Sequence, residues 1–337
     1  MQQERYSRQT RFAPFGEDGQ AALAKASAVV VGCGALGTVH AGLLARAGVG
    51  RILLLDRDYV EHSNLQRQML YTERDADEAL PKAEAARRHL VEANSSITIG
   101  AQVTDLNPEN IGELFEGADV IVDGTDNFET RMLINDWCVR ENTAWIYGAA
   151  VGSYGLVMPI LPGDTPCFRC MFPEPPGGAQ PTCETAGVLG PLTSVVGSLQ
   201  AMEALKVLAG KRDAVRRSII TVDLWDGRIR ETKLPAKDPA CPACGLRTFP
   251  YLEGARRIPV SLCGRNAVQI HDKARGVDLE QLAQRLAGLG TVRKNEFALR
   301  FIQDPYEITV FADGRAILKG TTDVAVARSL YSRFVGN

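Results

Sequence analysis

The chain has no run of about 18 apolar residues, the length that a membrane-spanning helix needs. Its first residues carry no apolar stretch that resembles a signal peptide. It also lacks an excess of charge of one sign, because 38 Lys and Arg face 40 Asp and Glu for a formal net charge of -2. No bulk positive field would therefore draw it to nucleic acid or an anionic membrane. We expect a cytoplasmic protein that binds neither.

The composition lacks the signature of disorder as well. Hydrophobic residues make up 45% and charged residues 23% of the 337 residues, which is typical of globular proteins. At roughly 150 residues per domain, this length predicts about two domains. The chain has eight cysteines, which are poor disulfide candidates in a reducing compartment, and four of them form two Cys-x-x-Cys pairs. The cysteine usage therefore points to metal.

Short β-branched runs alternate with longer helical patterns from Ser27 onward. This alternation predicts an α/β fold, a mostly parallel sheet with helices on both faces. Each run is continuously apolar, as expected of strands that are buried on both faces. The expected strands are residues 28–31, 51–55, 97–103, 119–122 and 144–149.

Beyond Tyr154 the pattern changes. A stretch rich in proline and glycine, residues 173–181, predicts a long crossing loop. Apolar residues at helical spacing over residues 192–205, followed by Gly210, then predict a buried helix with a glycine stop.

A linker rich in proline and charge precedes a new pattern, so we place a domain boundary near residue 253. Residues 1–253 form the larger expected domain, and residues 254–337 form a small α+β domain. No repeat, low-complexity tract or catalytic constellation is recognisable in this tail, and its role stays open. Its expected elements are a strand at 267–270, a helix at 278–286, short strands between 291 and 318 and a terminal helix from Asp323.

A glycine motif follows the first expected strand. Gly32, Gly34 and Gly37 form a Gly-x-Gly-x-x-Gly pattern, and Asp56 ends the next strand 19 residues after Gly37. Glycine lets the backbone approach a phosphate at a helix N-terminus, and the aspartate can accept hydrogen bonds from ribose hydroxyls. This is a nucleotide-binding fingerprint of Rossmann-like folds. A tight turn without a ligand is the alternative, and the motif alone favours a dinucleotide over ATP.

A polar run follows this aspartate. It offers an amide, a guanidinium and an ammonium that could neutralise phosphate oxygens around one nucleotide. Each of these groups alone would be ordinary solvated surface, so their order after a ribose-type aspartate is what favours a triphosphate site. The candidates are Asp58, Asn64, Arg67, Gln68 and Lys82.

An acidic turn follows the expected strand at 119–122. Its carboxylates lie at a strand's carboxyl end, where doubly wound sheets gather ligands. Asp126 could hold Mg²⁺, which favours one or two carboxylates with water and substrate phosphates. An Asx-type cap of the helix that follows is the alternative, and both could hold for neighbouring residues.

The paired cysteines are Cys167 with Cys170 and Cys241 with Cys244, separated by 70 residues. Two such pairs can complete a closed tetrahedral zinc site that staples the fold. Redox dithiols and unpaired core cysteines are the competing interpretations. Cys183 stands alone in the expected long loop, and a lone cysteine is most often inert.

The motifs described above resemble, in their order along the chain, those of the ThiF/MoeB adenylyltransferases, which are relatives of the ubiquitin-activating enzymes. Two further segments share this resemblance: Arg5-Tyr6-Ser7-Arg8-Gln9 and the Thr-Cys-Glu-Thr-Ala-Gly segment around Cys183. The resemblance covers residues 4 to about 246. It implies ATP-dependent adenylation of the C-terminal Gly-Gly carboxylate of a ubiquitin-like sulfur carrier protein, which prepares that carboxylate for conversion to a thiocarboxylate.

The resemblance also implies roles for the polar residues. It assigns Asp56 to the ribose, Asn64, Arg67 and Lys82 to the phosphates, and Asp126 to Mg²⁺. An ionised carboxylate that attacks the α-phosphate needs positioning and charge neutralisation but no protein base.

Two further residues acquire roles only from the resemblance. Arg8 matches an arginine that in this family reaches across a homodimer to the partner's ATP. Cys183 matches the cysteine that in ThiF-type members is the candidate for a covalent link to the carrier during sulfur transfer from a persulfide donor.

Within the family, residues 127–131, residues 146–149 and the C-terminal extension look closer to thiamine-pathway ThiF than to molybdopterin-pathway MoeB. A ThiS-like carrier is therefore the expected partner, and a MoaD-like carrier is the alternative. Some relatives carry a rhodanese domain, but Cys263 lacks that domain's loop context, so we assign no sulfurtransferase role.

Two functions from other classes stay open, an NAD-dependent oxidoreductase and a noncatalytic nucleotide-binding scaffold. An oxidoreductase would not need Arg8, Arg67, Lys82 and Asp126 together, and a scaffold should have lost members of this set. None is missing from the sequence.

Overall fold

The computed structural model describes residues 2–175, 185–254, 261–262, 267–271, 276–312 and 314–336. The chain separates into two compact units. Unit 1 comprises Met1–Asp77 and Lys82–Arg257, and unit 2 comprises Glu78–Pro81 and Ile258–Asn337. In the part of the chain that is described, no helix combines the length and the apolar character of a membrane span.

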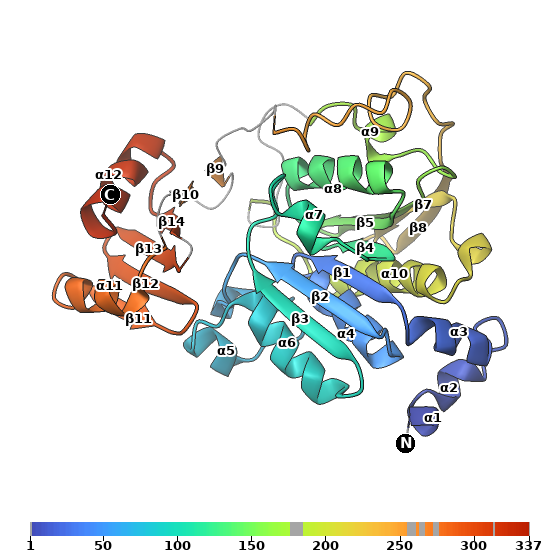
Figure 1. Cartoon of the computed structure of the whole chain (residues 1–337), viewed down its shortest axis with the longest axis horizontal. Helices are drawn as coiled ribbons and strands as arrows, with labels where there is room; N and C mark the ends of the chain where they lie inside the picture. Colours follow the sequence, from blue (N-terminus) through green and yellow to red (C-terminus); the bar gives the residue numbers. More distant parts are fainter. Residues whose placement is uncertain are drawn as a thin grey trace. The chain divides into compact units, whose positions relative to one another are not determined.

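Unit 1 is built on an eight-stranded sheet in the order β3-β2-β1-β4-β5-β6-β7-β8 (Figure 1). The first five strands in this order, β3, β2, β1, β4 and β5, pair in parallel, as the sequence predicts. The pairs β5–β6, β6–β7 and β7–β8 are antiparallel. Every residue of β1 and β4 is buried, which agrees with strands covered on both faces. The strands are β1 (Ser27–Val31), β2 (Arg51–Asp56), β3 (Thr98–Val103), β4 (Val120–Asp123), β5 (Ala144–Val151), β6 (Tyr154–Ile160), β7 (Ser218–Asp223) and β8 (Arg228–Lys233).

The antiparallel strands β6, β7 and β8 are absent from the sequence-based prediction. Pro159 lies within β6, and a proline in a sequence segment argues against predicting a central strand there. All residues of β8 are exposed, so this strand has no apolar periodicity to detect.

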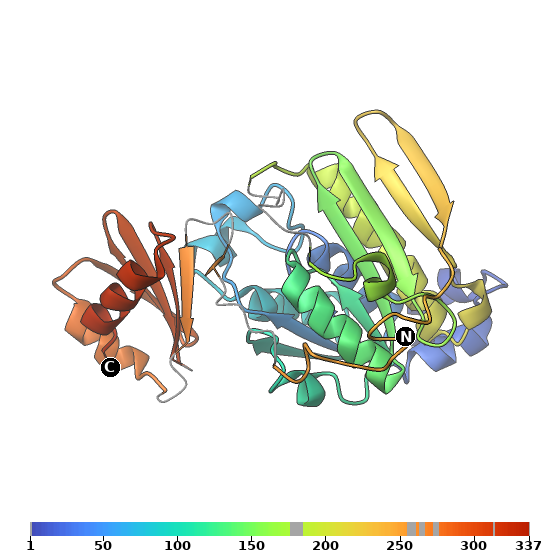
Figure 2. The same cartoon turned by 90° about the horizontal axis from the view of Figure 1, so that it is seen from above.

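Helices cover both faces of the sheet (Figures 1 and 2). α4 (Gly37–Ala47) and α10 (Gly190–Leu208) pack against one another on one face, and α8 (Phe128–Glu141) covers the other. α10 confirms the predicted buried helix, and Gly210 follows it with a φ of +71°. The remaining helical segments are α1 (Gln2–Arg5), α2 (Ser7–Thr10), α3 (Gly16–Leu23), α5 (Glu73–Asp77), α6 (Lys82–Ala93), α7 (Ile111–Leu114), α9 (Phe168–Met171), η1 (His62–Asn64) and η2 (Arg212–Ala214).

An aromatic cluster fills the core between the sheet and α8. Phe168 packs its ring 5.4 Å from that of Trp145 and 4.9 Å from that of Tyr147, measured between ring centres. Both partners are buried residues of β5. Because Phe168 follows Cys167 directly, this core contact fixes the first cysteine pair against the sheet.

Unit 2 has a six-stranded antiparallel sheet in the order β11-β12-β13-β14-β10-β9. Asp278 and Asp323 cap its two helices, each by accepting hydrogen bonds from two backbone N–H groups of the first turn. These elements confirm the predicted α+β pattern. They are β9 (Ser261–Leu262), β10 (Ala267–His271), α11 (Leu279–Leu286), β11 (Thr291–Lys294), β12 (Ala298–Gln303), β13 (Tyr306–Phe311), β14 (Arg315–Lys319) and α12 (Val324–Phe334).

Candidate nucleotide site and cysteine cluster

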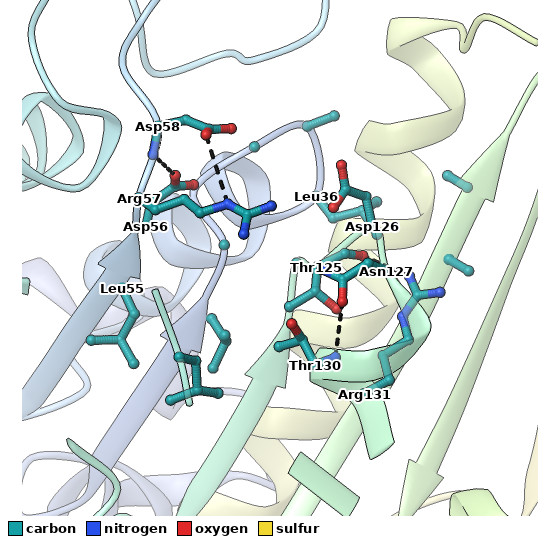
Figure 3. Close-up of a pocket in the computed structure, with 18 of the residues that line it drawn as sticks. Leu36, Leu55, Asp56, Arg57, Asp58, Thr125, Asp126, Asn127, Thr130 and Arg131 are labelled. Atoms are coloured by element: carbon teal, nitrogen blue, oxygen red, sulfur yellow. Dashed lines mark hydrogen bonds and ion pairs between the residues drawn. The ribbon is translucent and has the colours of Figure 1, made fainter. Parts of the chain in front are cut away.

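A cavity of about 370 Å³ opens at the carboxyl ends of the parallel strands of unit 1 (Figure 3). The strand order reverses between β1 and β4, and this switch point is where doubly wound sheets bind ligands. The cavity gathers segments that lie far apart in the sequence. Of the predicted nucleotide-site residues, its walls include Gly32, Gly34, Asp56, Asp58, Arg67, Gln68, Lys82 and Asp126.

The three motif glycines do different things. Gly32 has a φ of +88°, and a Cβ built on it would lie 2.7 Å from the carbonyl oxygen of Gly124. A Cβ on Gly37 would lie 1.8 Å from the carbonyl oxygen of Gly32, so this glycine packs the start of α4 and is absent from the cavity wall. Gly34 lines the cavity, and the nearest atom to its built Cβ is 3.9 Å away. It thus leaves room for a ligand to approach the backbone.

Asp56 organises the loops around the cavity. Its carboxylate accepts hydrogen bonds from the backbone N–H of Cys33 at 2.6 Å and of Asp58 at 2.7 Å. Burial raises the pKa of this carboxyl, and the Lys82 ammonium opposes that shift. The residue predicted to hold the ribose therefore also fixes the glycine loop.

Cationic side chains line the same wall, and carboxylates hold two of them. Lys82 Nζ lies 3.3 Å from Asp58 Oδ2, and both side chains are largely buried. Arg57 Nη1 donates to Asp105 Oδ1 at 3.0 Å. The two carboxylates thus hold an ammonium and a guanidinium at the cavity, and both of these groups can also donate hydrogen bonds to an anionic ligand.

Asn64 and Arg8 lie outside the cavity wall. Asn64 is buried in η1, and its Oδ1 accepts a hydrogen bond from the backbone N–H of Glu61 at 3.1 Å in a capping box. Arg8 is an exposed residue of α2 that donates to Ser7 Oγ at 3.4 Å. The structure thus brings neither of these residues to the cavity of its own chain.

The acidic turn after β4 forms the opposite wall (Figure 3). Asp123 is buried and accepts hydrogen bonds from Thr125 N at 2.8 Å and Thr125 Oγ1 at 2.7 Å. Burial raises the pKa of Asp123 to about 6 against the opposing effect of Arg131. Asn127 caps α8 by accepting from Thr130 N at 2.8 Å, so the alternative interpretation of this turn, an Asx-type cap, holds for Asn127. Asp126, next to the cap, is exposed and reaches the cavity.

Arg131 lines the cavity but had no separate role in the sequence-based prediction. Its guanidinium donates to the carbonyl of Thr125 at 2.6 Å and lies 5.1 Å from the ring centre of Tyr147. It therefore ties the acidic turn to β5 through a cation–π contact. The available signal was its position four residues after the cap Asn127, which places it one turn into α8 and beside the turn.

Cys167, Cys170, Cys241 and Cys244 come together as predicted, with their Sγ atoms all within 4.8 Å of one another. The Sγ atoms of Cys167 and Cys241 are 3.6 Å apart, and those of Cys170 and Cys244 are 3.3 Å apart. Thiolates about 2.3 Å from a tetrahedral metal ion lie about 3.8 Å from one another, so the cluster could hold a metal ion.

Neighbouring side chains of α8 bind the first cysteine segment and the chain that follows the second. Asn135 Oδ1 accepts from the backbone N–H of Phe168 at 2.9 Å. Asp136 pairs with Arg169 at 3.4 Å and accepts from the backbone N–H of Tyr251 at 3.3 Å. The sequence did not reveal these residues, because they lie more than thirty positions from the segments that they bind. Cys183, the remaining predicted site residue, lies outside the described residues.

The ThiF family model matches residues 6–243 of this chain. The chain belongs to the ThiF family. This confirms the resemblance seen in the ordered motifs. The ThiF match ends before most of unit 2 begins.

Two curated relatives carry this ThiF-family similarity. The sulfur carrier protein ThiS adenylyltransferase of Bacillus subtilis is 46% identical over 338 aligned residues, which cover 98% of this chain and 99% of the relative. The sulfur carrier protein adenylyltransferase of Thermus thermophilus is 42% identical over 72% of this chain and 90% of its own. The Bacillus protein therefore matches nearly the whole chain, and the Thermus protein does not.

Solved structures resemble the ThiF-family part of the chain. E. coli MccB with ATP has a TM-score of 0.62 at 26% identity, covering 72% of this chain and 74% of MccB. MccB with a MccA variant has a TM-score of 0.64 at 25% identity, covering 73% of this chain and 75% of MccB. The fold of unit 1 is thus one that binds ATP in a relative.

Proposed function

We propose that this protein uses ATP to adenylate the C-terminal Gly-Gly carboxylate of a ThiS-like, ubiquitin-like sulfur carrier for thiamine thiazole biosynthesis. The observation that carries the reaction is the gathering of Gly34, Asp56, Arg67, Lys82 and Asp126 on one cavity. These residues supply a phosphate approach, a ribose acceptor, two cations and a carboxylate in a space of about 370 Å³.

The chemistry needs positioning and charge neutralisation. A carboxylate oxygen of the carrier forms a bond to the α-phosphorus, and the bond from that phosphorus to pyrophosphate breaks. The attacking carboxylate is already ionised, so no side chain needs to remove a proton. Arg67 and Lys82 offset negative charge on the phosphate oxygens, and the glycine loop contributes backbone N–H groups at the start of α4.

Asp126 is suited to bind Mg²⁺, because it is an exposed carboxylate on the cavity wall. Mg²⁺ in nucleotide sites needs only one or two protein carboxylates. When bound, Mg²⁺ would supply charge neutralisation on the pyrophosphate leaving group. Asp126 is held at the end of β4 by a turn whose neighbours, Asp123 and Asn127, are both fixed by hydrogen bonds.

The four-cysteine cluster suits zinc. Three of its sulfur–sulfur separations lie between 3.3 and 3.9 Å and all lie within 4.8 Å, which fits a closed Cys₄ site with no open position for a substrate. We assign it a stapling role, since it joins segments that are 70 residues apart. The cytoplasm remains the expected compartment, because thiol ligands stay reduced there.

We further propose a homodimer in which Arg8 serves the cavity of the partner subunit. Arg8 is exposed and lies outside the cavity wall of its own chain, so a role at the nucleotide requires a second copy. Cys183 is proposed as the residue that links covalently to the carrier during sulfur transfer.

The carrier assignment rests on the match to the Bacillus ThiS adenylyltransferase over 98% of this chain. A MoaD-like carrier is the second candidate, because the Culex quinquefasciatus protein named adenylyltransferase and sulfurtransferase MOCS3 is 40% identical over 71% of this chain. Carrier-dependent ATP–pyrophosphate exchange with purified ThiS-like and MoaD-like proteins decides between them.

A further inference from the structure

Gln200 is a fully buried polar residue in the middle of the apolar helix α10. Its Nε2 donates to the carbonyl oxygen of Asp123 at 2.7 Å and to that of Ile146 at 3.1 Å. One side-chain amide thus bonds to the backbones of two different strands, β4 and β5.

The two carbonyls lie where these strands part. The parallel pairing of β4 with β5 ends at Val122 and Ile146. Beyond this point β4 turns into the acidic turn at Gly124, while β5 continues along β6 as far as Val151. Residues of both diverging segments line the cavity. We call the point where β4 and β5 separate the fork; it lies next to the nucleotide site. The Gln200 amide supplies the hydrogen bonds that strand pairing no longer provides at this fork, because leaving buried carbonyl groups unpaired would destabilise the fold.

The sequence leaves space for this amide. A Cβ built on Gly148 of β5 would lie 2.4 Å from Gln200 Cδ and 2.6 Å from its Nε2. One turn earlier on α10, a Cβ on Gly197 would lie 2.7 Å from the Cβ of Val39 in α4. The absence of side chains at these two positions lets α10 approach both the strand and the neighbouring helix closely.

His40 of α4 is also fully buried and lies beside the Gln200 side chain, but among the described residues neither of its ring nitrogens has a hydrogen-bond partner. Burial lowers the pKa of His40 to about 3, so the ring is neutral at physiological pH. The Gln200 amide is thus packed between Gly148 of β5, which has no side chain, and the uncharged ring of His40.

We propose that Gln200 is a positioning residue for the nucleotide site, which sets the fork between β4 and β5 and thereby places the turn that carries Asp126. This inference rests on the proposed function in that Asp126 serves magnesium-bound ATP. Gln200 itself does not line the cavity and acts through the backbone of Asp123.

The test compares Gln200→Met with Glu203→Met. Methionine keeps the length of glutamine but has no N–H donor, so both carbonyls lose their partner. Glu203 is a buried polar residue on the same helix, where it pairs with Lys206 at 2.7 Å and accepts from Arg216 N at 2.9 Å, away from the cavity wall. Its replacement removes a comparable buried anchor without touching the fork.

Three quantities are measured for each variant: the equilibrium dissociation constant for ATP, the Mg²⁺ concentration that gives half-maximal carrier-dependent exchange, and the urea midpoint of unfolding. Gln200→Met should weaken ATP binding and raise the Mg²⁺ requirement by about tenfold each, the loss typical when partners of a ligand-bearing group are removed. Glu203→Met should lower the urea midpoint but leave both other quantities within about twofold of wild type, inside the scatter of context effects.

Gly148→Ala gives a second route if Gln200→Met does not fold, because it keeps both donors and displaces the amide. It should weaken ATP binding like Gln200→Met, and its effect should vanish in a Gln200→Ala background, where the clash is relieved. Equal ATP affinity in Gln200→Met and Glu203→Met, or additive effects of Gly148→Ala and Gln200→Ala, would overturn the role of Gln200. Failure of the proposed function is distinct, since wild-type protein would then show no exchange with either carrier.

Discussion

The guanidinium of Arg131 lies 3.6 Å from the buried carboxylate of Asp123, at the base of the turn that carries Asp126. The same guanidinium donates to the Thr125 carbonyl at 2.6 Å. A buried ion pair therefore couples the end of β4 to the first turn of α8, on the sheet face opposite Gln200. The turn is held from both faces of the sheet.

This pair predicts a pH dependence of stability. The pKa of Asp123 is raised to about 6 by burial, whereas an unfolded aspartate titrates near 3.9. The folded state therefore binds the proton more tightly, and between about pH 4 and pH 6 the free energy of unfolding falls as pH rises. Asp123→Asn should remove this contribution, on the order of 2 kcal/mol across that window. Urea unfolding of the nucleotide-free protein at several pH values measures it. A difference from wild type that does not change between pH 4 and pH 7 would contradict the assignment.

Asp126→Ala should abolish adenylation while leaving the fold intact, because it removes the proposed magnesium ligand. We expect ATP–pyrophosphate exchange to fall by about 100-fold or more, with unchanged circular dichroism. Glu129→Ala is the matched control, since Glu129 is a nearby carboxylate in the first turn of α8 that does not line the cavity. Near-normal exchange in Asp126→Ala would refute the magnesium assignment.

The cysteine cluster predicts one zinc ion per chain in freshly purified, unchelated protein. Cys170→Ser should lose the metal and lower the melting temperature by roughly 10 °C before it affects chemistry. Cys138→Ala serves as a control, because Cys138 is buried in α8 and is not one of the four clustered cysteines. Metal analysis that finds no zinc in the wild-type protein would count against the site.

Arg8 should act across the proposed dimer. Arg8→Ala and Asp126→Ala chains, each inactive alone, should recover part of the exchange activity when mixed, because a heterodimer holds one site with both residues intact. Arg11→Ala, an exposed arginine at the end of the same short helix, should not lose activity. If verified subunit exchange restores nothing, Arg8 works within its own chain.

Cys183 should separate two reactions. Cys183→Ser is expected to leave ATP–pyrophosphate exchange nearly unchanged, since adenylation needs no thiol, and to impair thiocarboxylate formation from a persulfide donor. Equal loss of both reactions would indicate a structural role. Full retention of thiocarboxylate formation would favour sulfur delivery without this cysteine and the MoeB-like alternative.

The sequence predicted those features that depend on local patterns. The buried strand before Gly32, the cap Asn127 and the paired cysteines all leave a local signal of periodicity, side-chain chemistry or spacing. The family resemblance was confirmed because several such motifs occur in one order.

Long-range hydrogen bonds left no such signal. Gln200 is 77 residues from Asp123 in the sequence and stands in a helix whose apolar pattern indicates only core. Asn64 was placed with the phosphate ligands by its motif, whereas its side chain accepts from the backbone of Glu61 in the capping box of η1 and does not line the cavity. Backbone partners of this kind become visible only once the strands are paired.

Carrier-dependent ATP–pyrophosphate exchange tests the central claim most directly. Purified protein is incubated with ATP, Mg²⁺ and labelled pyrophosphate, with either a ThiS-like carrier, a MoaD-like carrier or a ThiS-like carrier that lacks its terminal Gly-Gly. The account predicts rapid formation of labelled ATP with the intact ThiS-like carrier, and none with the truncated one. Exchange that ignores the truncation, or that occurs only with the MoaD-like carrier, would contradict it.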